Sequence, residues 1–407
     1  MGRLAWKDCR ARGDWLQGGA NSKTSRRQRR RLSHSVHPHL CYALEMGDET
    51  RSLSGIEALC ARLSRRWQSL DRARQESTAV RESLANNLER LIPADTSFVT
   101  FGSIARQEFT RGSDVDWTLL VDGQADPSHD VAAQKIEEEL RSMQLKDPGP
   151  TGTFGSVTFS HELVHHIGGQ SDTNRNTTQR ILLLLESVAI GPTPAYERVI
   201  RAILSRYLDN DISFITQSRS GQHYKVPRFL LNDIVRYWRT MCVDYATKFR
   251  ERQGAEWALR NAKLRMSRKL IFASGLMICF SCYLQSPPPL ESLFESHALD
   301  SFAPLVVHLR TFVGKSPTDI LADALGNYTD DATAAKFFDA YDRFIEFVGS
   351  GTKREQLKKL AAKDAKTDST FIEIRRIADD FQDALNRLFF DSSELKLNDL
   401  TRKYGLF

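Results

Sequence analysis

The chain has 407 residues, 41% of them hydrophobic and 27% charged, which is typical of a soluble globular protein with two domains, or one domain and a helical extension. No uninterrupted apolar run approaches the ~18 residues of a membrane span, so we expect no span. The net charge of +6 arises in residues 1–45, which hold ten Lys and Arg against three Asp and Glu. The remainder is nearly neutral, which argues against binding of long nucleic acid.

Residues 1–45 also lack the apolar period of a helix or strand, and we expect a basic, disordered head. We favour Met46, which precedes a helical pattern, as the true start of the protein. Six cysteines and no secretory signal indicate free thiols and a cytoplasmic location. Cys279 and Cys282 lie in an apolar helical run, which favours core packing over a zinc or redox site.

A chain that starts at Met46 should melt at the same temperature as the full chain, because the head has no apolar face to bury. Thermal unfolding of the two forms measures this. A melting temperature several degrees lower in the shorter form would show instead that the head packs on the body.

The hydrophobic period changes along the rest of the chain. It is helical at first, then alternates as in strands, and from Thr173 onward it is helical almost throughout. The predicted fold class is therefore α+β, a small mixed sheet followed by an all-helical region. The predicted elements are a helix or helix pair within 52–92, strands at 97–101, 114–122 and 156–160, a short helix after Gly102, a helix at 129–145, and helices at 173–188, 194–208, 227–250, 254–285 and on to about 390.

The segment Phe98–Gly123 carries the most informative motif. A predicted strand ends at Gly102 and Ser103, where the bare glycine backbone and the free amides of a starting helix suit phosphate oxygens. Asp114 and Asp116 open the next predicted strand, where residues two apart face the same side with Cα atoms ~6.6 Å apart. Two carboxylates that close need a cation between them, and hard oxygen ligands suit Mg²⁺ that bridges phosphates.

This segment resembles the signature of the nucleotidyltransferase superfamily with the polymerase-β-like fold, in which Gly-Ser precedes Asp-x-Asp by about ten residues. The fuller pattern also holds Arg106, Glu108 and Ser113. It looks most like the branch that contains the uridylyltransferase of PII signal proteins and the glutamine synthetase adenylyltransferase. The resemblance covers about 25 residues, and the helical second half fits the family's usual architecture.

The resemblance implies a nucleoside triphosphate substrate and two Mg²⁺ ions. Gly102 and Ser103 would hold the nucleotide phosphates, with Arg106 as a further phosphate contact. Asp114 and Asp116 would act as the catalytic metal ligands. On this basis we divide the chain into a basic head at 1–45, an N-terminal helical segment at 46–92, a nucleotidyltransferase domain at 93–190 and a helical domain at 191–407.

The family has a third carboxylate on a neighbouring strand, but the predicted strand at 156–160 contains no acid. Glu162, just after that strand, is the nearest candidate and our predicted third catalytic residue. Asp172 is the next, although the Gly-Gly-x-Ser-Asp-Thr sequence around it also fits a turn and helix cap. If neither acid is in place, the domain would bind nucleotide without transferring it. A catalytically silent nucleotide-sensing module is therefore one alternative.

The pattern His161-Glu162-x-x-His165 has the spacing of a zinc protease motif, in which two histidines share a helix face and the glutamate acts as general base. Glu186 is the third ligand that such an enzyme would use. Because Gly168 follows so soon, the helix that carries the motif would be very short. A zinc metallohydrolase is thus the other alternative, and we expect the histidines to make local polar contacts instead.

The helical half contributes two basic stretches. Asn232, Arg236 and Arg239 share one predicted helix face, where the arginines would bind the nucleotide or the acceptor; a solvated face is an equal alternative. The stretch Arg260–Leu270 adds positive charge that would neutralise a triphosphate leaving group.

The predicted function is Mg²⁺-dependent transfer of a nucleoside monophosphate from ATP or another nucleoside triphosphate to an acceptor hydroxyl. The acceptor would be a protein or a small molecule, and no membrane partner is expected. Which nucleotide and which acceptor are used cannot be read from the sequence.

Overall fold

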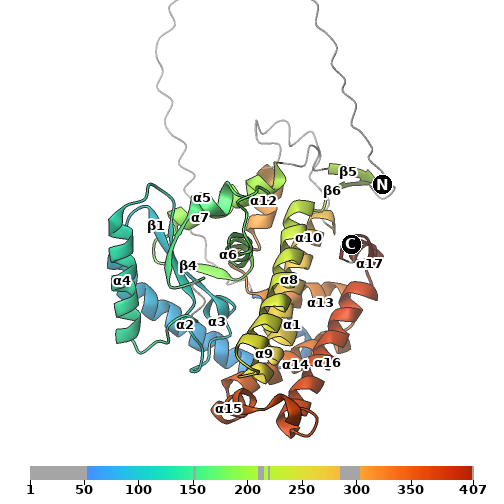
Figure 1. Ribbon diagram of the computed structural model, residues 1–407. Coiled ribbons are helices and arrows are strands. Elements are labelled where there is room, and N and C mark those ends of the chain that lie inside the picture. The colour runs from blue at the N-terminus through green and yellow to red at the C-terminus, as the bar shows by residue number, and fades with distance from the viewer. Residues whose placement is uncertain (1–52, 150–152, 210–214, 219–220, 285–302, 406–407) are drawn as a thin grey trace, which may run out of the picture. The chain divides into compact units, whose positions relative to one another are not determined.

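The computed structural model describes five stretches of the chain, residues 53–149, 153–209, 215–218, 221–284 and 303–405. The predicted basic head and Met46 lie outside these described residues. From residue 53 onward the described chain forms one compact unit. A four-stranded sheet with its covering helices lies beside a group of long helices (Figure 1), so the predicted α+β class is confirmed.

The sheet is mixed, and its strand order is β3-β2-β1-β4. Its strands are β1 (Thr96–Phe101), β2 (Trp117–Val121), β3 (Ser156–Phe159) and β4 (Ser187–Ile190). β1 pairs antiparallel with both β2 and β4, whereas β2 and β3 run parallel. A separate antiparallel hairpin joins β5 (Ile215–Ser218) to β6 (Gly221–Tyr224). β4 and this hairpin were not predicted, because the chain after Thr173 reads as helical.

Helices make up the rest of the described chain. Those that precede the hairpin are α1 (Gly55–Leu63), α2 (Gln68–Leu88), the turn η1 (Glu89–Leu91), α3 (Gly102–Ala105), α4 (Pro127–Ser142), α5 (Ser160–Val164), α6 (Asn174–Leu185) and α7 (Pro194–Leu208). The others are α8 (Arg228–Glu251), α9 (Trp257–Lys263), the π-helical turn η2 (Leu264–Arg268), α10 (Lys269–Leu284), α12 (Ala303–Arg310), α13 (Pro317–Tyr328), α14 (Asp331–Gly349), α15 (Gly351–Lys359), η3 (Ala362–Asp364), α16 (Ser369–Phe390), α17 (Leu395–Leu400) and η4 (Thr401–Gly405).

Neighbouring residues of the central strands face two different cores. Phe98 of β1 and Leu119 of β2 join a core with residues of α2 and α4, whereas Val99 and Leu120 join the larger core that the helical half builds. All four side chains are fully buried. A strand buried on both faces needs apolar residues in succession, which β1 and β2 supply. The sheet is thus a middle layer, and its strand ends are the parts that can form a site.

The N-terminal helices pack on the C-terminal ones. The Ile56 N–H donates to Oδ1 of Asp319 in α13 at 3.1 Å, and the Leu70 N–H donates to Oδ1 of Asp342 in α14 at 2.8 Å. These contacts join parts of the chain that are more than two hundred residues apart. The helical half is therefore held against the sheet region from both ends of the described chain.

One stretch of the described chain, Trp257–Leu284, is long and apolar enough to cross a membrane. It comprises α9, η2 and α10, and 67% of its most apolar window is buried within the protein. Cys279 and Cys282 are fully buried there, as the core-packing prediction requires, and burial raises the pKa of both thiols. The absence of a membrane span stays a prediction.

Candidate active site

Three neighbouring strands bring polar residues to one end of the sheet. Gly102 and Ser103 follow β1, Asp116 precedes β2, and Glu186 precedes β4. Because β1 runs antiparallel to β2 and to β4, all of these positions lie at the same edge. The Phe101 N–H confirms the register by donating to the Asp116 carbonyl oxygen, 2.8 Å away.

The end of β1 and the residues just before β2 line an inner cavity of about 120 Å³. The structure thus brings together five of the eight predicted site residues, Gly102, Ser103, Arg106, Asp114 and Asp116. The helical half supplies cationic and polar residues to the same cavity, namely Lys263, Ser267, Arg268 and Arg354.

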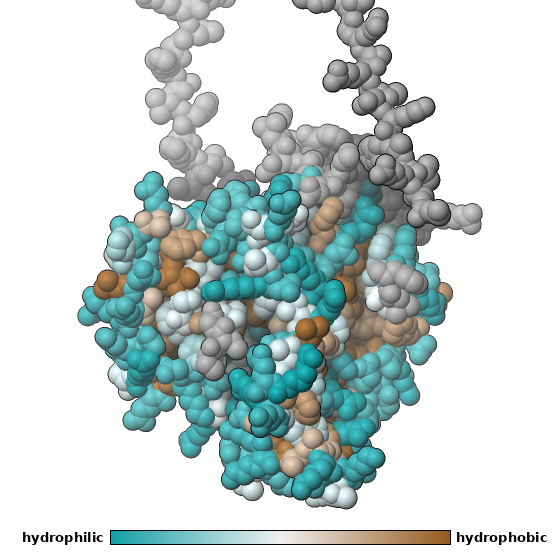
Figure 2. Space-filling view, viewed as in Figure 1, coloured by the Kyte–Doolittle hydropathy of each residue, from teal (hydrophilic) through white to brown (hydrophobic). Residues whose placement is uncertain are grey.

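An outer cavity of about 420 Å³ adjoins the inner one, and residues of α8, α9 and α15 line it. The two share part of their lining: Asp114, Lys263, Arg268 and Arg354. Together they form a cleft between the sheet and the helical half. Hydrophilic side chains cover most of the molecular face that carries α8, α9 and α15 (Figure 2).

Gly102 and Asp116 approach each other closely. A Cβ atom at residue 102 would stand 2.9 Å from Oδ2 of Asp116, closer than real Cβ contacts allow. Gly102 also has φ of +66°, in the left-handed region that other L-residues rarely adopt. Glycine is therefore required here for two separate reasons, and the bare backbone leaves the Asp116 carboxylate its place in the cavity.

The acidic pair lies just before β2 rather than within it, which corrects the predicted strand start at Asp114. The N–H of Val115 donates to the Lys146 carbonyl at 3.0 Å, so this residue pairs away from β1. Asp116 is half-buried and Asp114 is exposed at the cleft. Both carboxylates nevertheless line the inner cavity.

Burial raises the pKa of Asp116 to about 6; Arg268 opposes the rise, and the negative charges of Glu186 and Asp114 add to it. A cation at this carboxylate would favour its charged form. Among the described residues, no group of three or more His, Cys, Asp and Glu side chains is placed to hold a metal ion. Asp114 and Asp116 still fit Mg²⁺, which takes one or two carboxylates and completes its shell with waters and substrate phosphates.

Buried ion pairs support the floor of the inner cavity. Arg106 binds Glu108, with Nε 2.8 Å from Oε2, and it also binds Glu186. Arg268 reaches the other oxygen of Glu186 at 3.4 Å, and the Tyr341 hydroxyl donates to Glu108 at 2.6 Å. Two carboxylates thus balance the charge of Arg106, and these ion pairs hold the floor of the cavity in place. The predicted contact of Arg106 with a phosphate stays a prediction.

From the sequence, Glu186 was a candidate only as a zinc ligand. Its side chain is 1% exposed, and it lies between Arg106 and Arg268 at the same sheet edge as Asp116. The sequence does show an acid directly after an apolar helix. It would have pointed to this sheet edge only if the residues that follow, β4, had been predicted as a strand.

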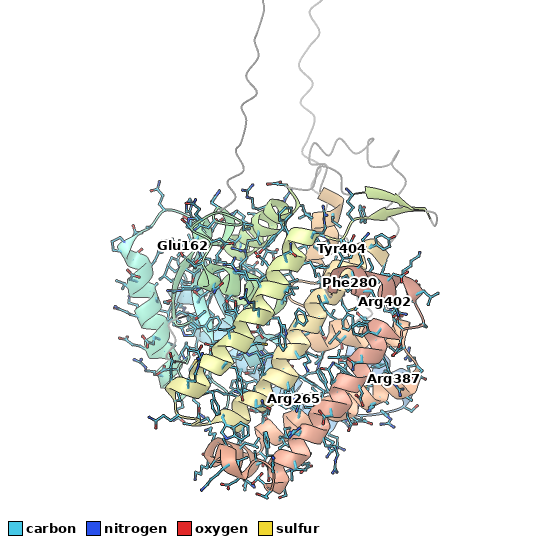
Figure 3. All side chains as sticks on the ribbon, turned by 45° about the vertical axis from the view of Figure 1, so that its right-hand side comes forward. Glu162, Arg265, Phe280, Arg387, Arg402 and Tyr404 are labelled. Atoms are coloured by element: carbon cyan, nitrogen blue, oxygen red, sulfur yellow. The ribbon has the colours of Figure 1, made fainter. Side chains whose placement is uncertain are left out.

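Topology separates Glu162 from Asp116. Because β3 runs parallel to β2, a residue that follows β3 lies at the opposite end of the sheet from one that precedes β2. Glu162 is exposed on α5, in the upper part of Figure 3, whereas Arg265 of η2 lies in the lower part. Asp172 is buried against Arg180, which donates to both carboxylate oxygens. The end of β3 therefore lies away from the cleft, and the predicted catalytic role of Glu162 lacks geometric support.

Arg236 and Arg239 of α8 do not line either cavity. Arg236 donates to the Asp172 carbonyl at 2.8 Å and to Oδ1 of Asn174 at 3.2 Å. It therefore helps to hold α8 on the start of α6. Arg239 is exposed. Their predicted contacts with nucleotide or acceptor stay a prediction.

No set of zinc ligands is present in the described part of the chain. The rings of His161 and His165 lie 4.8 Å apart, but α5 has only five residues and ends before His165. Glu186, the third ligand considered, lies at the other end of the sheet, bound to Arg106. The histidines instead make local contacts such as that of His166 Nδ1 with the side-chain amide of Asn176, 3.4 Å away.

His165→Ala should change any nucleotide transfer by less than about twofold, because an exposed side chain far from the cleft is removed. Elemental analysis of the purified full chain should find no stoichiometric zinc. Zinc near one atom per chain that disappears in the variant would restore the hydrolase alternative.

Comparison with known families agrees with this geometry. Residues 81–147 match the family model described as a nucleotidyltransferase domain. The matched segment contains β1, α3, β2 and α4, and with them Gly102, Ser103, Asp114 and Asp116. The match supports a transferase of nucleotidyl groups. No curated protein matches it significantly.

Proposed function

We propose that this protein moves a nucleoside monophosphate from a nucleoside triphosphate to an acceptor hydroxyl in a Mg²⁺-dependent reaction. One observation carries the proposal. Gly102, Ser103, Asp114 and Asp116, all within the matched segment, line a single cavity that cations of the helical half close. Such a cavity joins an acidic metal site to a cationic phosphate site.

The residues of the cavity have different roles in this reaction. Ser103 lies at the start of α3, which no side chain of the described residues caps, so its hydroxyl and the local amides would bind phosphate oxygens. Asp114 and Asp116 hold the metal, which would lower the pKa of the acceptor hydroxyl and stabilise the leaving pyrophosphate when bound. Arg268 and Glu186 position the Asp116 side of the cavity.

The resemblance to the superfamily supports two metal ions, and the likeness to the PII uridylyltransferase and glutamine synthetase adenylyltransferase branch supports a protein or small molecule as acceptor. The nearly neutral chain beyond residue 45 supports the same choice over long nucleic acid. The free thiols Cys60, Cys242, Cys279 and Cys282 are consistent with a cytoplasmic location.

A catalytically silent nucleotide sensor is the second candidate, because β3 carries no acid beside Asp116. The two are separated by incubating the full chain with Mg²⁺ and each common nucleoside triphosphate, labelled at the α-phosphate. Transfer predicts pyrophosphate release and a labelled acceptor, both lost with a chelator. Nucleotide binding without pyrophosphate release, in the presence of cell extract as acceptor source, would favour the sensor.

A further inference from the structure

A π-helical turn interrupts the long helix Trp257–Leu284 where it passes the cleft. In an α-helix, residues five apart point about 140° away from each other. The i→i+5 hydrogen bonds of a π-helix place such residues on the same side, and π turns often occur at functional sites. Lys263 and Arg268, at the two ends of η2, both line the inner cavity. The turn thus presents two cations to Asp114 and Asp116.

The charges of these cations are balanced differently. Arg268 binds the buried Glu186, as described above. Among the described residues, no carboxylate lies within ion-pair distance of Lys263 or of Arg354, whose guanidinium lies over Gly112 and donates to the Val348 carbonyl. Burial, together with the positive charges of Arg354 and Arg268, lowers the pKa of Lys263 to about 8, while the negative charge of Asp114 opposes this shift. Positive charge without a partner therefore gathers at this point of the cleft.

The position of this charge indicates the ligand. Lys263 and Arg354 line both cavities, beside Asp114. In the outer cavity, by contrast, carboxylates already bind Lys248 and Arg260, at 2.8 and 2.9 Å, and Lys146 donates to the Gly112 carbonyl at 3.3 Å. An anion therefore gains most at the junction of the two cavities, next to the acidic metal site.

We propose that Lys263 and Arg354 bind the β- and γ-phosphates of the nucleoside triphosphate, the part that leaves as pyrophosphate. This inference rests on the proposed function, in which the nucleoside triphosphate is the donor that these two residues orient. The π turn places Lys263 for this contact, and α15 brings Arg354 from the far end of the chain. The phosphate subsite is then shared between the sheet and the helical half.

Inorganic tripolyphosphate with Mg²⁺ is the probe, and calorimetry on the full chain measures its Kd. Lys263→Gln and Arg354→Gln remove the charge but keep a polar side chain, so each should raise the Kd about tenfold or more, since hydrogen bonds to charged groups contribute about 1.5–3 kcal/mol. Lys248→Gln is the matched control, a lysine of the same cleft that Asp244 already binds. It should change the Kd by less than about twofold. Thermal unfolding checks that each variant is folded, and Arg354→Gln carries the test if Lys263→Gln is not.

The possible outcomes separate the inference from the function. If the wild type binds tripolyphosphate and both test variants bind it equally well, the phosphate contact is wrong and the proposed function stands. If Lys248→Gln weakens binding as much as the test variants, general charge explains the effect and the inference falls. If the wild type neither binds tripolyphosphate nor releases pyrophosphate from any nucleotide, both proposals fail.

Discussion

Asp116→Asn should abolish nucleotide transfer and at the same time stabilise the metal-free protein at neutral pH. The amide keeps the size of the side chain beside Gly102 but removes the charge that a metal ion needs. We expect pyrophosphate release to fall roughly 10²-fold or more, as when one group that stabilises transition-state charge is lost.

The stability effect follows from the pKa of Asp116, which burial raises from 3.8 to about 6 in the folded protein. Because the folded pKa is the higher one, the folded state binds more protons between these two values. The free energy of unfolding therefore falls as pH rises through this window. Above it, the charged carboxylate costs the metal-free fold on the order of 3 kcal/mol. Asparagine carries no such cost.

Thermal unfolding with a chelator at pH 8 and pH 4 measures this effect. Asp116→Asn should be the more stable form at pH 8, and the difference should shrink toward pH 4. Asp114→Asn is the control, since Asp114 is exposed and contributes only part of the rise in the Asp116 pKa; its substitution should reduce transfer but raise stability less than Asp116→Asn does. A variant at residue 116 that transfers nucleotide normally would remove Asp116 from the metal site.

The part of the site that lies between Gly102 and Asp116 could be predicted because its geometry is local. One strand, one turn and the next strand start fix these residues within a short segment. The third acid depends instead on which strand ends meet. Parallel pairing of β2 with β3 carries Glu162 away, and antiparallel pairing of β1 with β4 brings Glu186 near. Proximity in sequence favoured Glu162, whereas pairing direction, a long-range property, places it at the other end of the sheet.

Other features of the structure were not predicted for similar reasons. β4 follows the apolar run of α6 almost without a break, and only its pairing with β1 makes it a strand. The stretch Arg260–Leu270 was predicted to supply positive charge for the leaving group. Its π turn was not predicted, because the spacing of apolar residues does not distinguish a π turn from an α-helix. Arg354 left no local signal, since it reaches the cleft from α15.

Gly102→Ala should disable the site without removing any functional group. A side chain at φ of +66° costs about 1–2 kcal/mol, and its Cβ would meet Oδ2 of Asp116 at 2.9 Å. The backbone cannot easily yield, because the Phe101 N–H is bonded to the Asp116 carbonyl across the strands. The Asp116 carboxylate must therefore move. A displacement near 1 Å at a catalytic group costs roughly 10²-fold in rate, so we expect a loss of that order in pyrophosphate release.

Gly168→Ala is the matched control for this change. Gly168 has φ of +72°, so the substitution carries the same backbone strain, but no atom lies within 4 Å of the added Cβ. It lies outside both cavities. Both variants should lower the melting temperature, whereas only Gly102→Ala should lose activity. Equal loss in the two variants would assign the effect to backbone strain, and full activity in Gly102→Ala would contradict the close approach of Gly102 to a metal ligand.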